Sequence, residues 1–231
     1  METLPLFLPI LFGLTVLGSL ILFYLAIRSK TFLILAIGWI TLQSVLGLSG
    51  IYQNTELVPP RLMLFGVLPT LIFITLTFVT EKGRAFIDRV NLKTLTHFHS
   101  IRIPVEIVLL LLYYNQVMSV YITFEGTNFD IISGITAPIV GYLAFRKSTK
   151  RQLLIWWNML CLLLLFNVVV TAVLALPSPF QQLAFDQPNI AVMYFPFNLL
   201  PAFVVPLVLF AHLISFRQLT GKSELAEFQR R

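Results

Sequence analysis

Residues 101–124 read IRIPVEIVLLLLYYNQVMSVYITF, an apolar run that contains both a cation and an acid. At about 100° per residue, the polar side chains of this run lie within roughly 80° of one another on a helix; they are Arg102, Glu106, Tyr113 and Gln116. Moving an acid into hydrocarbon costs about 2.5 kcal/mol or more, so this stripe is expected to face other helices or a wet cavity. The pattern therefore predicts a transmembrane helix at the centre of the fold.

The composition is that of an integral membrane protein. The 231 residues are 58% hydrophobic and 11% charged, with a mean hydropathy of +0.88, which is far above that of a soluble domain. Several apolar runs reach the roughly 20 residues that a helix needs to cross the hydrocarbon core, and they lack the short alternating pattern of barrel strands. The sequence thus predicts an all-α, polytopic membrane protein.

The apolar runs predict a single seven-helix membrane domain over residues 1–216. The expected spans are about 4–27, 31–51, 62–79, 101–124, 131–145, 153–176 and 197–216. The leader METLP carries no Lys or Arg, so the first span is expected to be a retained helix rather than a signal peptide. Residues 81–100 mix basic with apolar side chains, which predicts a basic connector at the membrane surface. Residues 217–231 are expected to form a polar cytoplasmic tail.

The basic residues favour one orientation of the chain. With seven spans, all of the 16 Lys and Arg residues except Arg61 lie on the side of loops 1–2, 3–4 and 5–6 and of the tail. The positive-inside rule then predicts an external N-terminus and a cytoplasmic C-terminus, in a multi-pass protein of a bacterial inner membrane. Because these cations lie in short loops beside apolar runs, the net charge of +6 is a topology signal, and no nucleic-acid partner is expected.

Two ionisable side chains of different spans are expected at similar depth near the inner edge of the membrane. With a rise of about 1.5 Å per residue, Glu106 lies roughly 8 Å and His212 roughly 6 Å inside that edge. Arg102 and Asn158 belong to the same layer. These residues predict a cytoplasm-facing polar pocket in which Glu106 and His212 bind or relay a proton or hold a ligand head group. The alternative is structural, because Arg102 and Glu106 are four residues apart and satisfy each other on a helix.

Three amides are expected deeper in the membrane, roughly 18 to 22 Å from the cytoplasmic edge: Gln43, Gln116 and Asn167. One hypothesis is that they line a midplane cavity, and together with Tyr113 they are candidate ligand-binding residues. The alternative is that they hold helices together, at about 0.6 kcal/mol per contact.

The sequence predicts neither a metal site nor a cofactor. Cys161 is the only cysteine, and the chain contains no HExxH motif and no pair of opposed haem ligands on two spans. Glu125 and Asp130 flank a short turn, and the two interpretations of this pair are a cation site and helix capping. Capping by Asp130 is favoured because acidic side chains are stabilised before a helix N-terminus.

Three classes of function remain open. The favoured hypothesis is a bundle that binds, senses or transports a small molecule or lipid, since polar interiors and proline-kinked spans are common where transporters build sites. The second is a membrane-embedded lipid- or isoprenoid-modifying enzyme that uses Glu106 and His212 as acid and base. The third is a scaffold or assembly subunit. Membrane lipids are the expected partners, and the sequence does not predict an oligomeric state.

Overall fold

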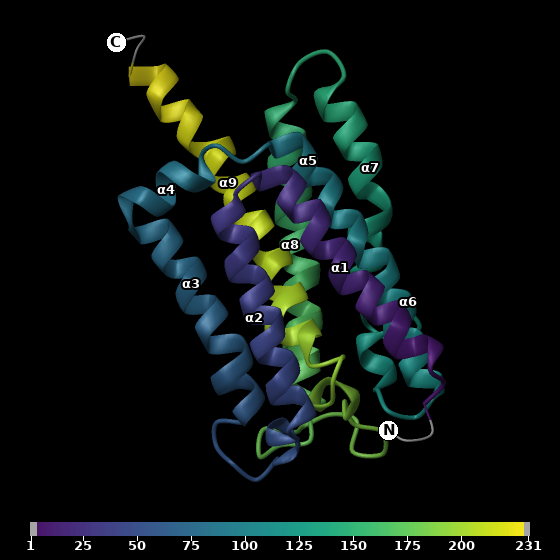
Figure 1. Ribbon diagram of the computed structural model, residues 1–231. Coiled ribbons are helices and arrows are strands. Elements are labelled where there is room, and N and C mark those ends of the chain that lie inside the picture. Colours follow the sequence, from purple (N-terminus) through teal and green to yellow (C-terminus); the bar gives the residue numbers. More distant parts are fainter. Residues whose placement is uncertain (1–3, 229–231) are drawn as a thin grey trace.

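The computed structural model describes residues 4–228, and it is 73% helical, with no β-strand in that range. Within these described residues, six helical segments are long and apolar enough to cross a membrane, namely α1 (Phe7–Ile27), α2 (Lys30–Leu48), Leu62–Val79, Leu92–Tyr114, α8 (Arg151–Leu174) and Leu200–Gly221. A shorter apolar helix, α7 (Ile131–Phe145), accompanies them. By length and composition of its helices, the chain is a multi-pass membrane protein. Figure 1 shows a bundle in which α1 begins at one end and α9 (Val205–Phe228) finishes at the other.

Two of the spans begin with π-helical turns. The segment Leu62–Val79 consists of η2 (Leu62–Val67) and α3 (Leu68–Val79), and η6 (Leu200–Val204) leads directly into α9. Each π segment is followed within two residues by a proline, Pro69 or Pro206, whose ring carries no N–H for the preceding turn. The wider turn accommodates the missing donor without ending the helix.

The central span differs from its predicted bounds at the start. Residues 81–100, expected to be a surface connector, contain α4 (Glu81–Ile87) and then α5 (Leu92–Phe98), which continues through η3 (His99–Ile101) into α6 (Arg102–Tyr114). Asn91 Oδ1 accepts from Thr94 N at 2.9 Å and so starts the helix. Because the span begins at Leu92, Arg102 lies near its middle, roughly 15 Å from where the helix starts.

The same span also ends earlier than residue 124. Gln116 has a φ of 61°, in the left-handed region that a continuing helix excludes, and the chain turns there. Residues 115–130, which include η4 (Val120–Ile122), then return along α6, because Asn128 contacts Glu106 and Asp130 contacts Arg102. As a result α7 begins at the level of Arg102, inside the bundle. This return explains why the fifth apolar helix has only 15 residues.

Aromatic side chains and one long loop complete the core. Phe23 of α1 packs against Phe32, Phe98 and Phe210, which come from α2, α5 and α9, with ring centroids 5.2 to 5.9 Å apart. The loop between α8 and η6, which contains η5 (Ala191–Met193), covers the turn at the end of α6. Its Gln187 Nε2 donates to the carbonyl oxygens of residues 113 and 118, at 2.8 and 2.7 Å.

The last helix continues beyond the predicted start of the tail at residue 217. Arg217 Nε and Nη2 each donate to a carboxylate oxygen of Asp88 at 2.8 Å, and Gln218 Nε2 donates to the carbonyl oxygens of Ile87 and Val90. These contacts tie α9 to the α4–α5 junction and explain why the helix persists. Residues 1–3 and 229–231, the outer ends of the predicted domain and tail, lie outside the described residues.

Candidate functional site

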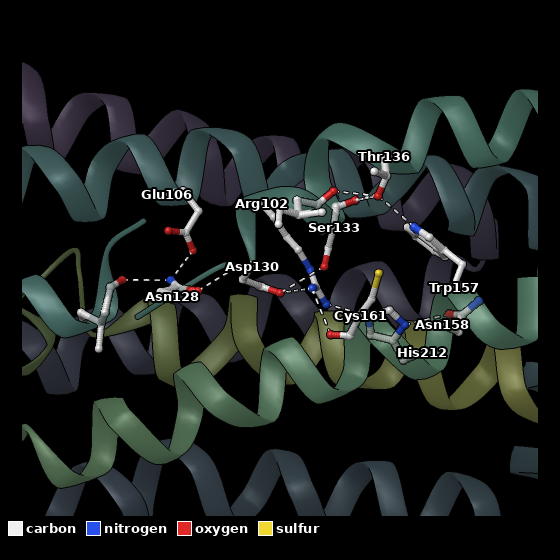
Figure 2. A network of polar contacts seen from close by, with 12 residues as sticks. Arg102, Glu106, Asn128, Asp130, Ser133, Thr136, Trp157, Asn158, Cys161 and His212 are labelled. Atoms are coloured by element: carbon white, nitrogen blue, oxygen red, sulfur yellow. Dashed lines mark hydrogen bonds and ion pairs between the residues drawn. The ribbon is translucent and has the colours of Figure 1, made fainter. Parts of the chain in front are cut away.

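Buried polar side chains from α6, residues 115–130, α8 and α9 form one connected network near the middle of the bundle. Figure 2 shows Arg102 between Asp130 and His212, with Glu106 and Asn158 toward opposite ends. The members are at most 5% exposed, and they are Arg102, Glu106, Asn128, Asp130, Asn158 and His212. Burying polar groups at this depth costs free energy unless they are hydrogen-bonded to one another, so their convergence marks a candidate site. We call this set of six residues the buried network.

Arg102 is the central member of the buried network. Its Nη1 donates to Asp130 Oδ1 in a buried ion pair and approaches the carbonyl oxygen of Cys161 at 3.4 Å, while its Nη2 lies 2.6 Å from His212 Nε2. Gly134 permits this geometry, because a Cβ atom there would lie 2.9 Å from Ile103 Cγ1 and 3.3 Å from Arg102 Cβ. Close approach of α7 to α6 thus requires a glycine at this position.

The partners of His212 define its tautomer. Arginine has only donors, so His212 Nε2 must accept from Arg102 Nη2. The proton of the neutral ring is therefore on Nδ1, which donates to Asn158 Oδ1 at 2.8 Å, and Asn158 Nδ2 donates onward to the carbonyl oxygen of Leu154. Both ring nitrogens of His212 are engaged, and in this arrangement neither is free to act as a general base.

Asn128 connects the two carboxyl groups of the buried network. Its Nδ2 donates to Glu106 Oε1 at 2.6 Å and to the carbonyl oxygen of Ile122 at 2.9 Å, and its Oδ1 accepts from the backbone N–H of Asp130 at 2.9 Å. Glu106 therefore pairs with an amide and makes no hydrogen bond to Arg102. The alternative in which Arg102 and Glu106 simply satisfy each other is not the arrangement found.

Asp130 has a different role from the predicted helix cap. It is the N-cap residue of α7, but its side chain makes no capping hydrogen bond. Its carboxylate instead accepts a hydrogen bond from Arg102 Nη1 and another from Ser133 Oγ, the latter at 3.3 Å. Charge attraction to a buried guanidinium outweighs the roughly 1 kcal/mol that a cap contributes.

Several buried polar atoms around the buried network have no hydrogen-bond partner in the part of the chain that the structure describes. They are Arg102 Nε, Glu106 Oε2 and both ring nitrogens of His99, and outside the buried network Asn198 Oδ1. His99 lies against His212 with ring centroids 4.0 Å apart and an interplanar angle of 22°. An unsatisfied buried group costs about 1–3 kcal/mol, so their concentration at one place favours a functional interpretation over a purely structural one.

Residues 59–220 match the sequence model of a family described as a domain of unknown function, DUF8737. The chain belongs to the DUF8737 family. The matched segment contains every member of the buried network, whereas α1 and α2 precede it. No curated protein and no solved structure matches the chain.

Gln43 belongs to a separate polar cluster that lies partly outside the DUF8737 segment. Its Nε2 donates to the carbonyl oxygen of Phe65 at 2.9 Å, its Oε1 accepts from Tyr52 Oη at 2.5 Å, and its carbonyl oxygen accepts from Asn198 Nδ2 at 2.8 Å. Burial raises the pKa of Tyr52 to about 12, so its hydroxyl keeps the proton that it donates. This cluster joins α2, η2 and the start of the last span.

Besides Gln43, three candidate ligand-binding residues lie outside the buried network. Tyr113 packs against the ring of Tyr114, with centroids 5.4 Å apart. Gln116 is exposed at the left-handed turn, and Asn167 is exposed and donates Nδ2 to the carbonyl oxygen of Thr127 at 2.9 Å. The midplane layer of three amides does not form, because the chain leaves the helix before Gln116.

Sequence reasoning did not place Asn128, Asp130 or His99 in the predicted polar pocket. The usable signal was the length of the fifth apolar run, since 15 residues rise about 22 Å, less than a full hydrocarbon core. A short helix after a polar turn implies that the turn itself enters the bundle. Within the described residues, no group of three or more His, Cys, Asp or Glu side chains is arranged to hold a metal ion.

Proposed function

We propose that this protein binds or transports a small molecule or lipid within the membrane, and that its buried network takes up and releases one proton in the process. The observation that carries the proposal is that the buried network contains two carboxyl groups, Glu106 and Asp130, but a single cation, Arg102, which is ion-paired with Asp130. His212 is neutral in this arrangement, so Arg102 supplies the only positive charge among the network's members.

Charge balance defines what the buried network holds. An unpaired buried charge costs several kcal/mol, so two ionised carboxylates beside one guanidinium are unfavourable. One proton on either carboxyl group makes the buried network neutral. Glu106 is the better acceptor for it, because Asp130 is ion-paired and Glu106 Oε2 has no other partner.

The buried network holds a proton rather than conducting one along its length. Neither the guanidinium of Arg102 nor the amide of Asn128 releases a proton at neutral pH. A change in the protonation of Glu106 instead alters the negative charge that Arg102 must balance. Arg102 in turn is bound to α8 through the carbonyl oxygen of Cys161 and to α9 through His212. Proton uptake is thereby linked to the packing of four segments, which is how ion-coupled carriers link protonation to binding.

The proposal includes seven membrane segments, with α7 as the short one, an external N-terminus and a cytoplasmic C-terminus. Support comes from the arrangement in Figure 1, where the α1–α2 turn, α4 with the start of α5, the α7–α8 loop and the end of α9 lie at one end of the bundle. These segments carry most of the Lys and Arg residues, while Arg61 follows α2 in the loop at the other end. By the positive-inside rule, the basic end faces the cytoplasm of a bacterium.

The accessibility of Cys161 provides the test. The residue is buried, is the only cysteine and is bound through its carbonyl oxygen to Arg102. In proteoliposomes, the rate of its modification by a small thiol reagent, corrected for thiolate content with a model thiol, is expected to change with pH. Glu106→Gln should abolish that change and Glu125→Gln, on the exposed turn, should preserve it. An identical pH response in Glu106→Gln contradicts the proposal and favours the scaffold hypothesis.

The ligand needs a separate measurement. Mass spectrometry of small molecules and lipids that remain with the purified protein is expected to reveal a compound that Arg102→Gln loses. A wild-type protein that retains only the bulk lipids of its membrane, in the same proportions as Arg102→Gln, contradicts the binding part of the proposal.

A further inference from the structure

A cleft of about 640 Å³ lies at the basic end of the bundle, away from the buried network. It is formed by the α4–α5 junction, by the end of α7 with the α7–α8 loop and the first residue of α8, and by the part of α9 where its apolar stretch ends. Its lining includes the cations Arg89, Lys93 and Arg151 and the apolar side chains Phe145 and Leu219. Figure 1 shows these segments gathered at the end where α9 leaves the bundle.

The charge of the cleft is positive. Arg89, Lys93 and Arg151 line it, and the one acid among the lining residues, Asp88, already has both carboxylate oxygens bonded to Arg217 at 2.8 Å. Arg151 is held in place by a hydrogen bond of 3.3 Å from its Nη2 to the carbonyl oxygen of Thr220. Three cations from two separate parts of the chain therefore converge without an equivalent acid, a combination that favours a phosphate-bearing anion.

The depth of the cleft indicates where that anion comes from. Leu92 and Arg151 are the first residues of two apolar spans, and Leu219 lies two residues before Gly221, the last residue of a third. The cleft thus lies at the level where hydrocarbon meets water. Its lining combines the cations with apolar side chains, among them Phe145 and Leu219, as a lipid head group with its first acyl carbons requires.

We propose that this cleft binds the head group of an anionic phospholipid from the surrounding leaflet. Arg89, Lys93 and Arg151 contact the phosphate, and the apolar lining contacts the glycerol backbone and the start of the acyl chains. Bound there, the lipid clamps the α4–α5 junction to α8 and α9, so its binding stabilises the fold independently of any proton in the buried network.

Native mass spectrometry of the full chain in a neutral detergent tests this site. Titration with phosphatidylglycerol is expected to show one saturable site, which phosphatidylcholine and inorganic phosphate do not fill. The triple variant Arg89→Gln, Lys93→Gln, Arg151→Gln should weaken this binding at least tenfold. A control triple variant, Arg28→Gln, Lys30→Gln, Lys82→Gln, removes the same charge from exposed positions of other segments and should bind within twofold of wild type.

Four results would overturn the proposal. Equal losses in the two triple variants would mean that general charge, and not this cleft, attracts the lipid. Equal binding of phosphatidylcholine would remove the anionic requirement, and displacement of the lipid by inorganic phosphate would indicate a soluble phosphate compound. The charge-conserving variant Arg89→Lys, Arg151→Lys guards against misfolding, since it should retain phosphatidylglycerol; its failure to bind would contradict a site based on positive charge.

Discussion

Arg102 Nη2 of α6 lies 2.6 Å from His212 Nε2 of α9, which joins two spans whose contacting residues are 110 positions apart. Each of these residues lies near the middle of its span, with Arg102 in Leu92–Tyr114 and His212 in Leu200–Gly221. Because His212 accepts from Arg102 and donates to Asn158, a single ring connects α6, α8 and α9. The polar centre of the fold therefore depends on Arg102 for both charge and position.

Replacement of Arg102 by Gln should strongly destabilise the protein, because Asp130 then lies buried without its cation. Breaking a buried ion pair costs about 3–5 kcal/mol, whereas an exposed pair contributes about 0–1 kcal/mol. Arg217→Gln, which breaks the half-exposed pair with Asp88, is the matched control. Thermal unfolding in detergent, followed by the reaction of buried Cys161 with a thiol-reactive dye, measures both. Equal stability of the two variants would contradict the network geometry.

Asn128→Ala should destabilise the fold by about 1–3 kcal/mol, since it leaves Glu106 and the backbone N–H of Asp130 without partners. The side chain of the neighbouring Thr127 makes one hydrogen bond on the exposed turn, to the carbonyl oxygen of Tyr121, and Thr127→Ala should cost less than about 0.5 kcal/mol. The same unfolding assay compares them. An Asn128→Ala protein as stable as Thr127→Ala would show that residues 115–130 do not return along α6.

Gly47→Ala should destabilise the contact between α2 and the last span, because the new Cβ would lie 2.6 Å from Asn198 Oδ1. Overpacking of this kind costs about 1–3 kcal/mol. Gly38 is on the same helix and has no neighbour within 4 Å of a Cβ atom, so Gly38→Ala should be neutral or slightly stabilising. The apparent unfolding temperatures of the two variants test this prediction. A Gly47→Ala variant as stable as Gly38→Ala contradicts this packing.

The proposed orientation predicts the behaviour of reporters fused to the C-terminus. Green fluorescent protein fused after residue 231 should fluoresce in a bacterial host, and alkaline phosphatase at the same place should be inactive, because the basic end faces the cytoplasm. Active phosphatase together with a dark fluorescent fusion would reverse the topology.

Periodicity and hydropathy were sufficient to predict an all-helical chain with several apolar helices that are compatible with a membrane, and the structure confirms this. Equal depth along straight helices also placed Arg102, His212 and Asn158 in one layer. These residues do converge, but Arg102 and His212 lie near the middle of their spans rather than near the inner edge as predicted, because the fourth span begins at Leu92 and the last span continues to Gly221. Such reasoning works because the rise per residue is nearly constant inside a helix. It locates side chains along the membrane normal without any knowledge of neighbours.

The same reasoning failed where the chain leaves the helix. Depth estimates assumed that residues 115–124 continue the span, but the left-handed Gln116 reverses the chain and brings Asn128 and Asp130 back to the polar centre. Hydropathy alone does not reveal a polar turn that enters the bundle, because its cost is offset by partners distant in sequence. Asp130 is the clearest case, because local sequence favours a helix cap there, whereas its side chain forms a long-range ion pair with Arg102.

Infrared spectroscopy of the reconstituted protein at neutral pH tests the central claim most directly, since a protonated carboxyl group has a carbonyl stretch that an ionised carboxylate lacks. The account predicts a protonated-carboxyl band in the wild-type protein that disappears in Glu106→Gln and persists in Glu125→Gln. A spectrum without such a band, or a band that Glu106→Gln leaves unchanged, would show that the buried network holds no proton at Glu106.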